Sequence, residues 1–123
     1  MQEESTLREI EGLLEEARVL KAKGDIKGSL NLVRRIIWVS FSSVLSSIGI
    51  DAPYDSILSL YHLIPIGMRP PIGERELEHF EQEYRLALYS DQPLNSEFME
   101  ASLDIAERAF HWASSMMRMK PRK

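Results

Sequence analysis

Apolar residues recur every three or four positions along almost the whole chain, and they never alternate over a strand-length stretch. This spacing places side chains on one face of an α-helix, because the helix has about 3.6 residues per turn. Glycine and proline interrupt the pattern at a few places. The uninterrupted segments predict helices over residues 6–23, 25–48, 55–63, 74–89 and 95–119. We therefore predict an all-α protein.

Four of these helices are long and one is short. That pattern indicates an up-and-down four-helix bundle with one short extra helix in the 49–73 connection. Gly24 and Gly49 supply helix stops, and Asp25 can cap the helix that follows Gly24. Residues 64–73 hold three prolines and two glycines, which is too many for a helix. We expect an ordered connection there.

The second predicted helix is apolar over more of its circumference than one core face requires. Its main stripe is Ile26, Leu30, Val33, Ile37, Phe41, Val44 and Ile48, and a second set is Leu32, Ile36 and Val39 with Trp38 beside it. Such a helix is either central in the bundle or part of an interface between subunits. The interface candidates are Ile36, Trp38, Val39, Trp112 and Met116. Core packing is the alternative for the same residues.

Length and composition narrow the class of protein further. The 123 residues leave room for one domain, so we expect a single bundle over 1–123 with a basic tail at 118–123. The absence of cysteine excludes disulfides and thiolate chemistry. A net charge of −4 argues against a broad nucleic-acid surface, although the tail leaves weak RNA contact open. No segment is typical of a membrane span or a signal sequence, and we expect a cytoplasmic protein.

Motifs for metal or cofactor chemistry are weak. Glu76 and His79 form one Glu-x-x-His pair, but both point away from the predicted inward face of Leu77, Phe80, Tyr84 and Leu88. His62 and His111 are isolated from other ligand types. The serines of residues 40–47 lack a nucleophile motif, and no glycine-rich loop opens a helix. We expect no metal and no cofactor.

Two segments carry a family resemblance. They are GDIKGSLNLVRRIIWVSFSSVLSSIGID, after the first amphipathic helix, and EYRLALYSDQPLNSEFMEASLDIAERAFHWAS. The second has Arg85 and Tyr89 at a helix end, Ser90 and Asp91 in a short polar linker, and the pair Ala106–Glu107 in the final helix. Over nearly the whole chain this resembles the HEPN superfamily (higher eukaryotes and prokaryotes nucleotide-binding domain), whose members are small helical bundles that usually dimerise.

The resemblance implies a member without the RNase motif. That motif is Arg-x4–6-His, and two protomers bring it together. Here Arg75 and His79 have three intervening residues, and Tyr89 and Asp91 follow Arg85 where a histidine is needed. Tyrosine, with a pKa near 10, is a poor base at neutral pH. Some members of this kind resemble the substrate-binding half of nucleotidyltransferases and are paired with a separate minimal nucleotidyltransferase chain.

We therefore expect a non-catalytic, homodimeric binding module whose partner is a nucleotidyltransferase protein or a nucleotide ligand. Its candidate ligand- or partner-binding residues are Arg85, Tyr89 and Asp91, although an ion pair between Glu81 and Arg85 would be a purely structural alternative. A second hypothesis is a divergent metal-independent RNase of a toxin–antitoxin system that uses Arg85, Tyr89 and His111 from a dimer cleft. A third is a structural module that shares only the bundle pattern.

Overall fold

The computed structural model describes residues 2–51, 55–89 and 96–118, and this part of the chain is an all-α helical bundle without strands. The elements are α1 (Gln2–Ala22), α2 (Ile26–Ser47), α3 (Ile57–Leu63), the 3₁₀ turn η1 (Ile66–Met68), α4 (Glu74–Tyr89) and α5 (Ser96–Arg118). These bounds confirm the predicted helices, although α1 begins at Gln2 and not at Thr6. Of the predicted basic tail, only Arg118 lies within the described residues.

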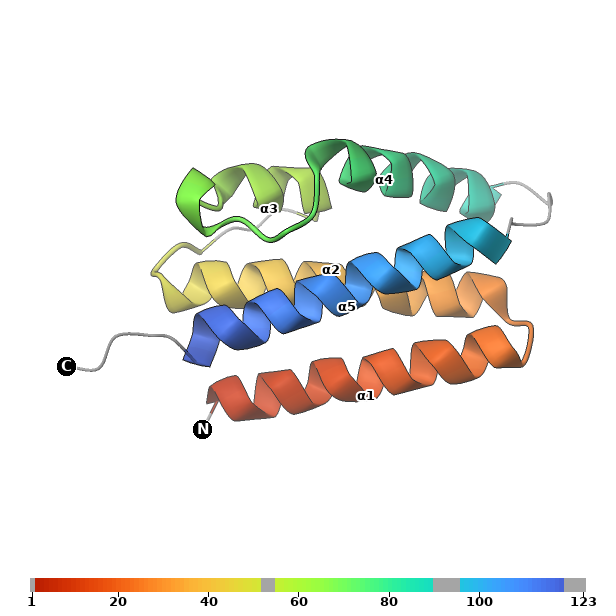
Figure 1. The fold of residues 1–123 in the computed structure, drawn as a ribbon, viewed down its shortest axis with the longest axis horizontal. Coiled ribbons are helices and arrows are strands. Elements are labelled where there is room, and N and C mark those ends of the chain that lie inside the picture. Colours follow the sequence, from red (N-terminus) through yellow and green to blue (C-terminus); the bar gives the residue numbers. More distant parts are fainter. Residues whose placement is uncertain (1, 52–54, 90–95, 119–123) are drawn as a thin grey trace.

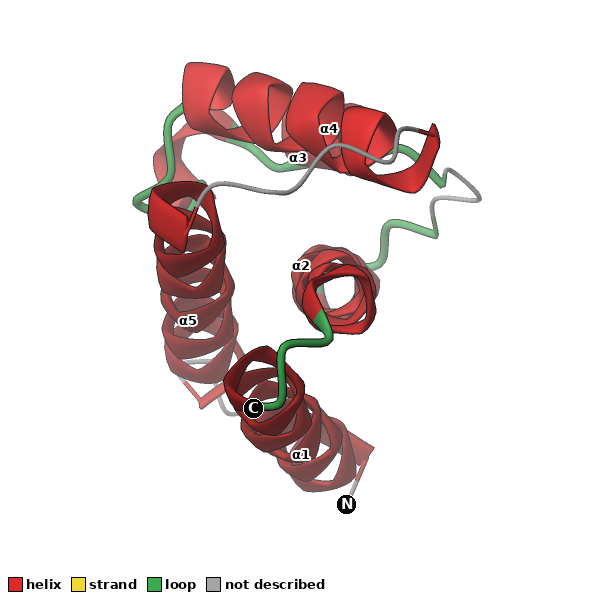
Figure 2. Cartoon of the chain, turned by 90° about the vertical axis from the view of Figure 1, so that its right-hand side faces the viewer, coloured by secondary structure: helices red, strands yellow, loops and turns green. Residues whose placement is uncertain are grey.

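The central element is α2. In Figure 1, α1, α2 and α5 run along the long axis, while α3 and α4 lie on the side of α2 opposite α1. Figure 2 looks along α2 and shows α1, α5 and α4 arranged around it. The chain packs α2 against α1, α5, α3 and α4. A helix with neighbours on several sides needs apolar residues on several faces, which explains its second apolar set.

Three of the five interface candidates belong to the core of this bundle. Ile36, Val39 and Trp112 are buried within the single chain, so the core of the bundle uses them and leaves little of their surface for a second subunit. Trp38 and Met116 are partly buried and pack against the same core. Of the two explanations for the apolar second helix, its central position in the bundle is the one that the fold bears out.

Phe41 lies where α2, α3 and α5 meet. Its side chain is fully buried, and its ring lies 5.7 Å from the ring of Trp112 in an edge-on arrangement. The ring of Tyr61 on α3 lies 6.2 Å away on another side. Phe41 therefore joins three helices through aromatic contacts.

The 64–73 connection is ordered, as predicted, because side chains from α3 and α5 bind its backbone. Tyr61 donates to the carbonyl of Ile72 (3.2 Å), and the Trp112 indole donates to that of Met68 (2.8 Å). Arg108 donates to the carbonyl of Pro71 (2.8 Å). A proline-rich segment cannot pair its backbone within a helix, so these donors satisfy carbonyls that the helices leave free.

The inward face of α4 differs from the prediction. Leu77 and Phe80 are buried as expected, but Glu81 and Ala87 are also buried, while Leu88 is 38% exposed. Leu88 shares the angular position of Leu77 on the helix but lies in its last turn. Figure 2 shows the C-terminal end of α4 extending past α2, which leaves this turn less covered.

Candidate functional site

Arg85 and Tyr89 lie together on the exposed side of the last turns of α4, because residues four positions apart share one face of a helix. Leu86 lies between them. Tyr89 is 87% exposed and Leu86 is 60% exposed, so two large side chains lie in solvent within one helical turn. These three residues, with Gln82 and Glu83, line a shallow hollow of about 430 Å³. We call Arg85, Leu86 and Tyr89 the α4 surface. Asp91 lies outside the described residues.

Arg85 does not form the ion pair with Glu81 that the sequence left as an alternative. Glu81 points towards the bundle, where its carboxylate lies 3.7 Å from the guanidinium of Arg34 on α2. Within the described part of the chain Arg85 has no ion pair, so its guanidinium is free for an external group. Arginine and tyrosine, together with tryptophan, are enriched at the energetic centres of protein interfaces.

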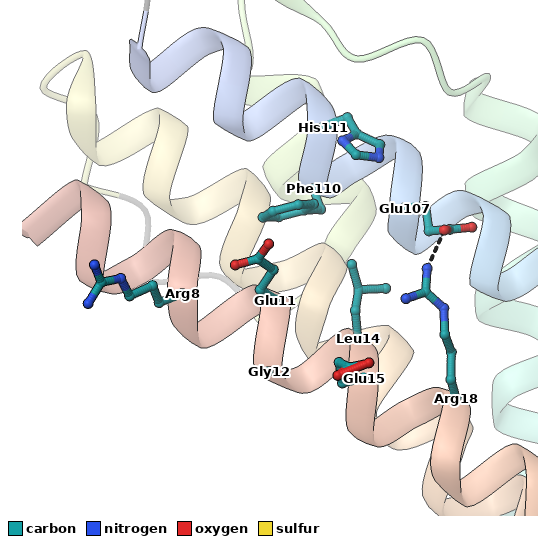
Figure 3. A pocket seen from close by; sticks show the side chains of 9 residues that line it. All are labelled: Arg8, Glu11, Gly12, Leu14, Glu15, Arg18, Glu107, Phe110 and His111. Carbon is teal, nitrogen blue, oxygen red and sulfur yellow. Dashed lines mark hydrogen bonds and ion pairs between the residues drawn. The ribbon is translucent and has the colours of Figure 1, made fainter.

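His111 lies elsewhere, in a groove between α1 and α5 (Figure 3). Leu14 and Phe110 point into this groove of about 540 Å³, and Arg18 and Glu107 form an ion pair across it. A second ion pair, Lys21 with Glu100 (3.7 Å), crosses the same seam nearer the end of α1. We call this the α1–α5 groove.

The α1–α5 groove and the α4 surface are lined by different residues, so one chain does not bring His111 to the same hollow as Arg85 and Tyr89. A general base must lie within hydrogen-bond reach of the proton that it removes. The divergent-RNase hypothesis therefore requires a second chain to supply the histidine.

Most of the acidic and histidine side chains near the connection have structural partners. His62 lies 2.9 Å from Glu74, and this hydrogen bond lowers the pKa of the Glu74 carboxyl. Glu76 receives two hydrogen bonds from Arg108 and one from the Gly73 amide, and these lower its pKa. His79 is exposed and lies against the ring of Phe98. Among the described residues no three potential ligands gather around a common metal position.

A polar cluster between α2 and α4 was not predicted. It consists of Asn31, Arg34, Asp55, Glu81 and Tyr84, and we call it the α2–α4 cluster. The Tyr84 hydroxyl donates to the Asn31 side chain (2.6 Å), and the Arg34 guanidinium lies over the Tyr84 ring, 5.6 Å from its centre. Burial raises the pKa of Tyr84, so its hydroxyl remains a donor at neutral pH. The signal was present in the sequence, because Glu81 lies four residues after Leu77 and so shares its face.

No family model, no curated protein and no solved structure matches this chain. Nor does any helix in the described ranges combine the length and the apolar character needed to cross a membrane.

Proposed function

We propose that this chain is a non-catalytic, homodimeric binding module, as its resemblance to the HEPN superfamily implies. The observation that supports the proposal is the α4 surface, where a leucine and a tyrosine are largely exposed within one helical turn, beside an arginine that has no ion pair with any other described residue. A second copy would cover Leu86, because an exposed apolar side chain gains free energy when it leaves water. Arg85 and Tyr89 would then lie at the groove between the two subunits.

Leu86→Glu tests the dimer contact. A buried glutamate without a partner is costly, so the variant is expected to shift the solution mass from twice the chain mass towards 14.2 kDa. Light scattering during size exclusion measures this mass. The matched control is Val19→Glu, which makes the same change at a 48% exposed position on α1 and should leave the dimer intact. Equal masses for wild type and Leu86→Glu would contradict the proposed contact.

The partner of this dimer would be a nucleotidyltransferase protein or a nucleotide, with Arg85 as the phosphate-binding group. A guanidinium binds phosphate oxygens in a bidentate manner, and the exposed Arg85 has no ion pair with another described residue that would compete for it.

Arg85→Ala is therefore expected to weaken ATP binding at least about tenfold in a calorimetric titration, since a charge-assisted hydrogen bond contributes about 1.5–3 kcal/mol. Arg75→Ala is the matched control, because Arg75 is an exposed arginine on the same helix outside the α4 surface. Equal losses in the two variants would indicate general charge attraction instead of a site. If wild type binds no ATP, the nucleotide form of the proposal is wrong.

A further inference from the structure

The two halves of α4 are attached to the bundle in different ways. The first half buries Leu77 and Phe80, and both side chains are almost completely covered. In the second half the inward positions hold Glu81, Tyr84 and Ala87, so a carboxylate and a partly exposed phenol replace large apolar side chains. This second half carries the α4 surface. Its attachment therefore depends on the α2–α4 cluster more than on apolar packing.

Arg34 is shared within that cluster. Its shortest hydrogen bond goes to the backbone carbonyl of Asp55 (2.8 Å), while the carboxylates of Asp55 and Glu81 lie 3.8 and 3.7 Å from its nitrogens. Glu81 is only 7% exposed, and its Oε1 atom is buried without a hydrogen bond in the described structure. The buried carboxylate of Glu81 is thus compensated by the charge of Arg34, but it accepts no short hydrogen bond from it.

Such a pair fixes geometry more than it adds stability. Removing a carboxylate from water is expensive, and an ion pair repays that cost only when its geometry is good and its remaining lone pairs are satisfied. Replacing both partners by apolar residues of similar volume is often neutral or stabilising, whereas removing one partner leaves an uncompensated charge. The pair of Arg34 and Glu81 meets neither condition, because its nitrogen–oxygen distance is 3.7 Å and Oε1 of Glu81 lacks a donor.

We infer that Arg34 is a positioning residue for the α4 surface. It compensates the buried charge of the Glu81 carboxylate, which would otherwise drive the second half of α4 away from α2, and this half detaches from the bundle before the remaining helices unfold. The inference that the second half of α4 opens locally depends only on the geometry of the α2–α4 cluster. Its consequence for dimerisation rests on the proposed function. Proteins open in local units of this kind where apolar contacts are few.

Hydrogen exchange of the α4 amides tests the inference. The experiment uses the Leu86→Glu background, so that contacts between subunits do not protect α4. Arg34→Met is expected to lower the protection of the amides of residues 85–89 at least about tenfold, because the buried Glu81 carboxylate then favours the open state. Amides in the middle of α1 and α5 should change less than about threefold, since they exchange only through larger openings.

Two further variants make the result specific. Glu81→Met should leave the protection of residues 85–89 unchanged or higher, because Arg34 keeps the carbonyl and the carboxylate of Asp55 as partners. The double variant Arg34→Met, Glu81→Met should recover most of the loss. Arg35→Met is the matched control, because Arg35 is the adjacent arginine and pairs with Glu9 on α1 at an exposed position. A uniform loss across all helices, or a loss in Glu81→Met as large as in Arg34→Met, would overturn the inference.

The solution mass separates this inference from the proposed function. In the protein that keeps Leu86, Arg34→Met should weaken dimerisation, and Glu81→Met should not. If exchange changes as expected while the dimer is unaffected by Arg34→Met, the local opening is correct and the α4 surface is not the dimer contact. If the dimer weakens in Arg34→Met without a local change in exchange, the positioning role is wrong.

Discussion

Replacing Phe41 with alanine is expected to lower the free energy of unfolding by about 3–5 kcal/mol. The ring is fully buried and contacts aromatic rings from α3 and α5, so its removal leaves a cavity at the junction of three helices. The loss comprises the transfer free energy of the missing atoms and the contacts of the side chains that surround the cavity. Urea denaturation followed by circular dichroism measures it.

Phe41→Leu keeps this test informative if the alanine variant fails to fold. Leucine retains much of the apolar volume, so the loss should be less than half of that in Phe41→Ala. Equal losses in the two variants, or a loss below about 1 kcal/mol in Phe41→Ala, would contradict the central place of Phe41 in the core.

Arg108→Met is expected to lower the free energy of unfolding by about 2 kcal/mol. The reason is that the Arg108 guanidinium links α5 to the start of α4 and to the connection that precedes α4. Arg108 donates to Glu76 through two nitrogens (2.7 and 3.2 Å) and to the carbonyl of Pro71 (2.8 Å). Charge-assisted hydrogen bonds contribute about 1.5–3 kcal/mol when buried, and the partial exposure of this pair reduces that figure. Arg75→Met, at an exposed position on α4, should be neutral in the same denaturation experiment.

The loss in Arg108→Met should also depend on pH. The pKa of Glu76 lies below its ordinary value of 4.5, first because of the Arg108 hydrogen bond and then because of the Gly73 amide. A carboxyl with a lowered pKa stabilises the folded state above pH 4.5, and this contribution disappears as the pH falls through the folded pKa. The difference between wild type and Arg108→Met should therefore be largest near neutral pH and shrink below pH 4.5. A difference that grows on acidification would contradict this account.

Helix positions could be predicted from the sequence because local signals mark their ends. The Asp25 side chain accepts a hydrogen bond from the Gly28 amide, and Ser56 accepts one from Ser59, as N-cap residues do. Gly24 and Gly49 have positive φ angles of 86° and 85°, which few other residues adopt. These signals are contained within a few residues, so no knowledge of the packing is needed to read them.

The placement of side chains between helices could be predicted only in part. Periodicity assigned Arg85 and Tyr89 to one flank of α4, and they line one hollow. Periodicity did not indicate that Glu81 is buried, because a charged residue on an amphipathic helix is usually assigned to solvent even where its spacing places it inward. It misjudged Leu88, since periodicity gives the direction of a side chain and not whether another helix covers it. Which side chains of α4 are covered depends on how α4 crosses α2, which is a property of the whole bundle.

The mass of the wild-type protein in solution tests the central claim most directly. Light scattering during size exclusion, carried out over a range of protein concentrations, should give twice the chain mass of 14.2 kDa, with a shift towards the monomer in Leu86→Glu but not in Val19→Glu. A wild-type mass of 14.2 kDa at every concentration would contradict the claim that the α4 surface joins two copies of this chain.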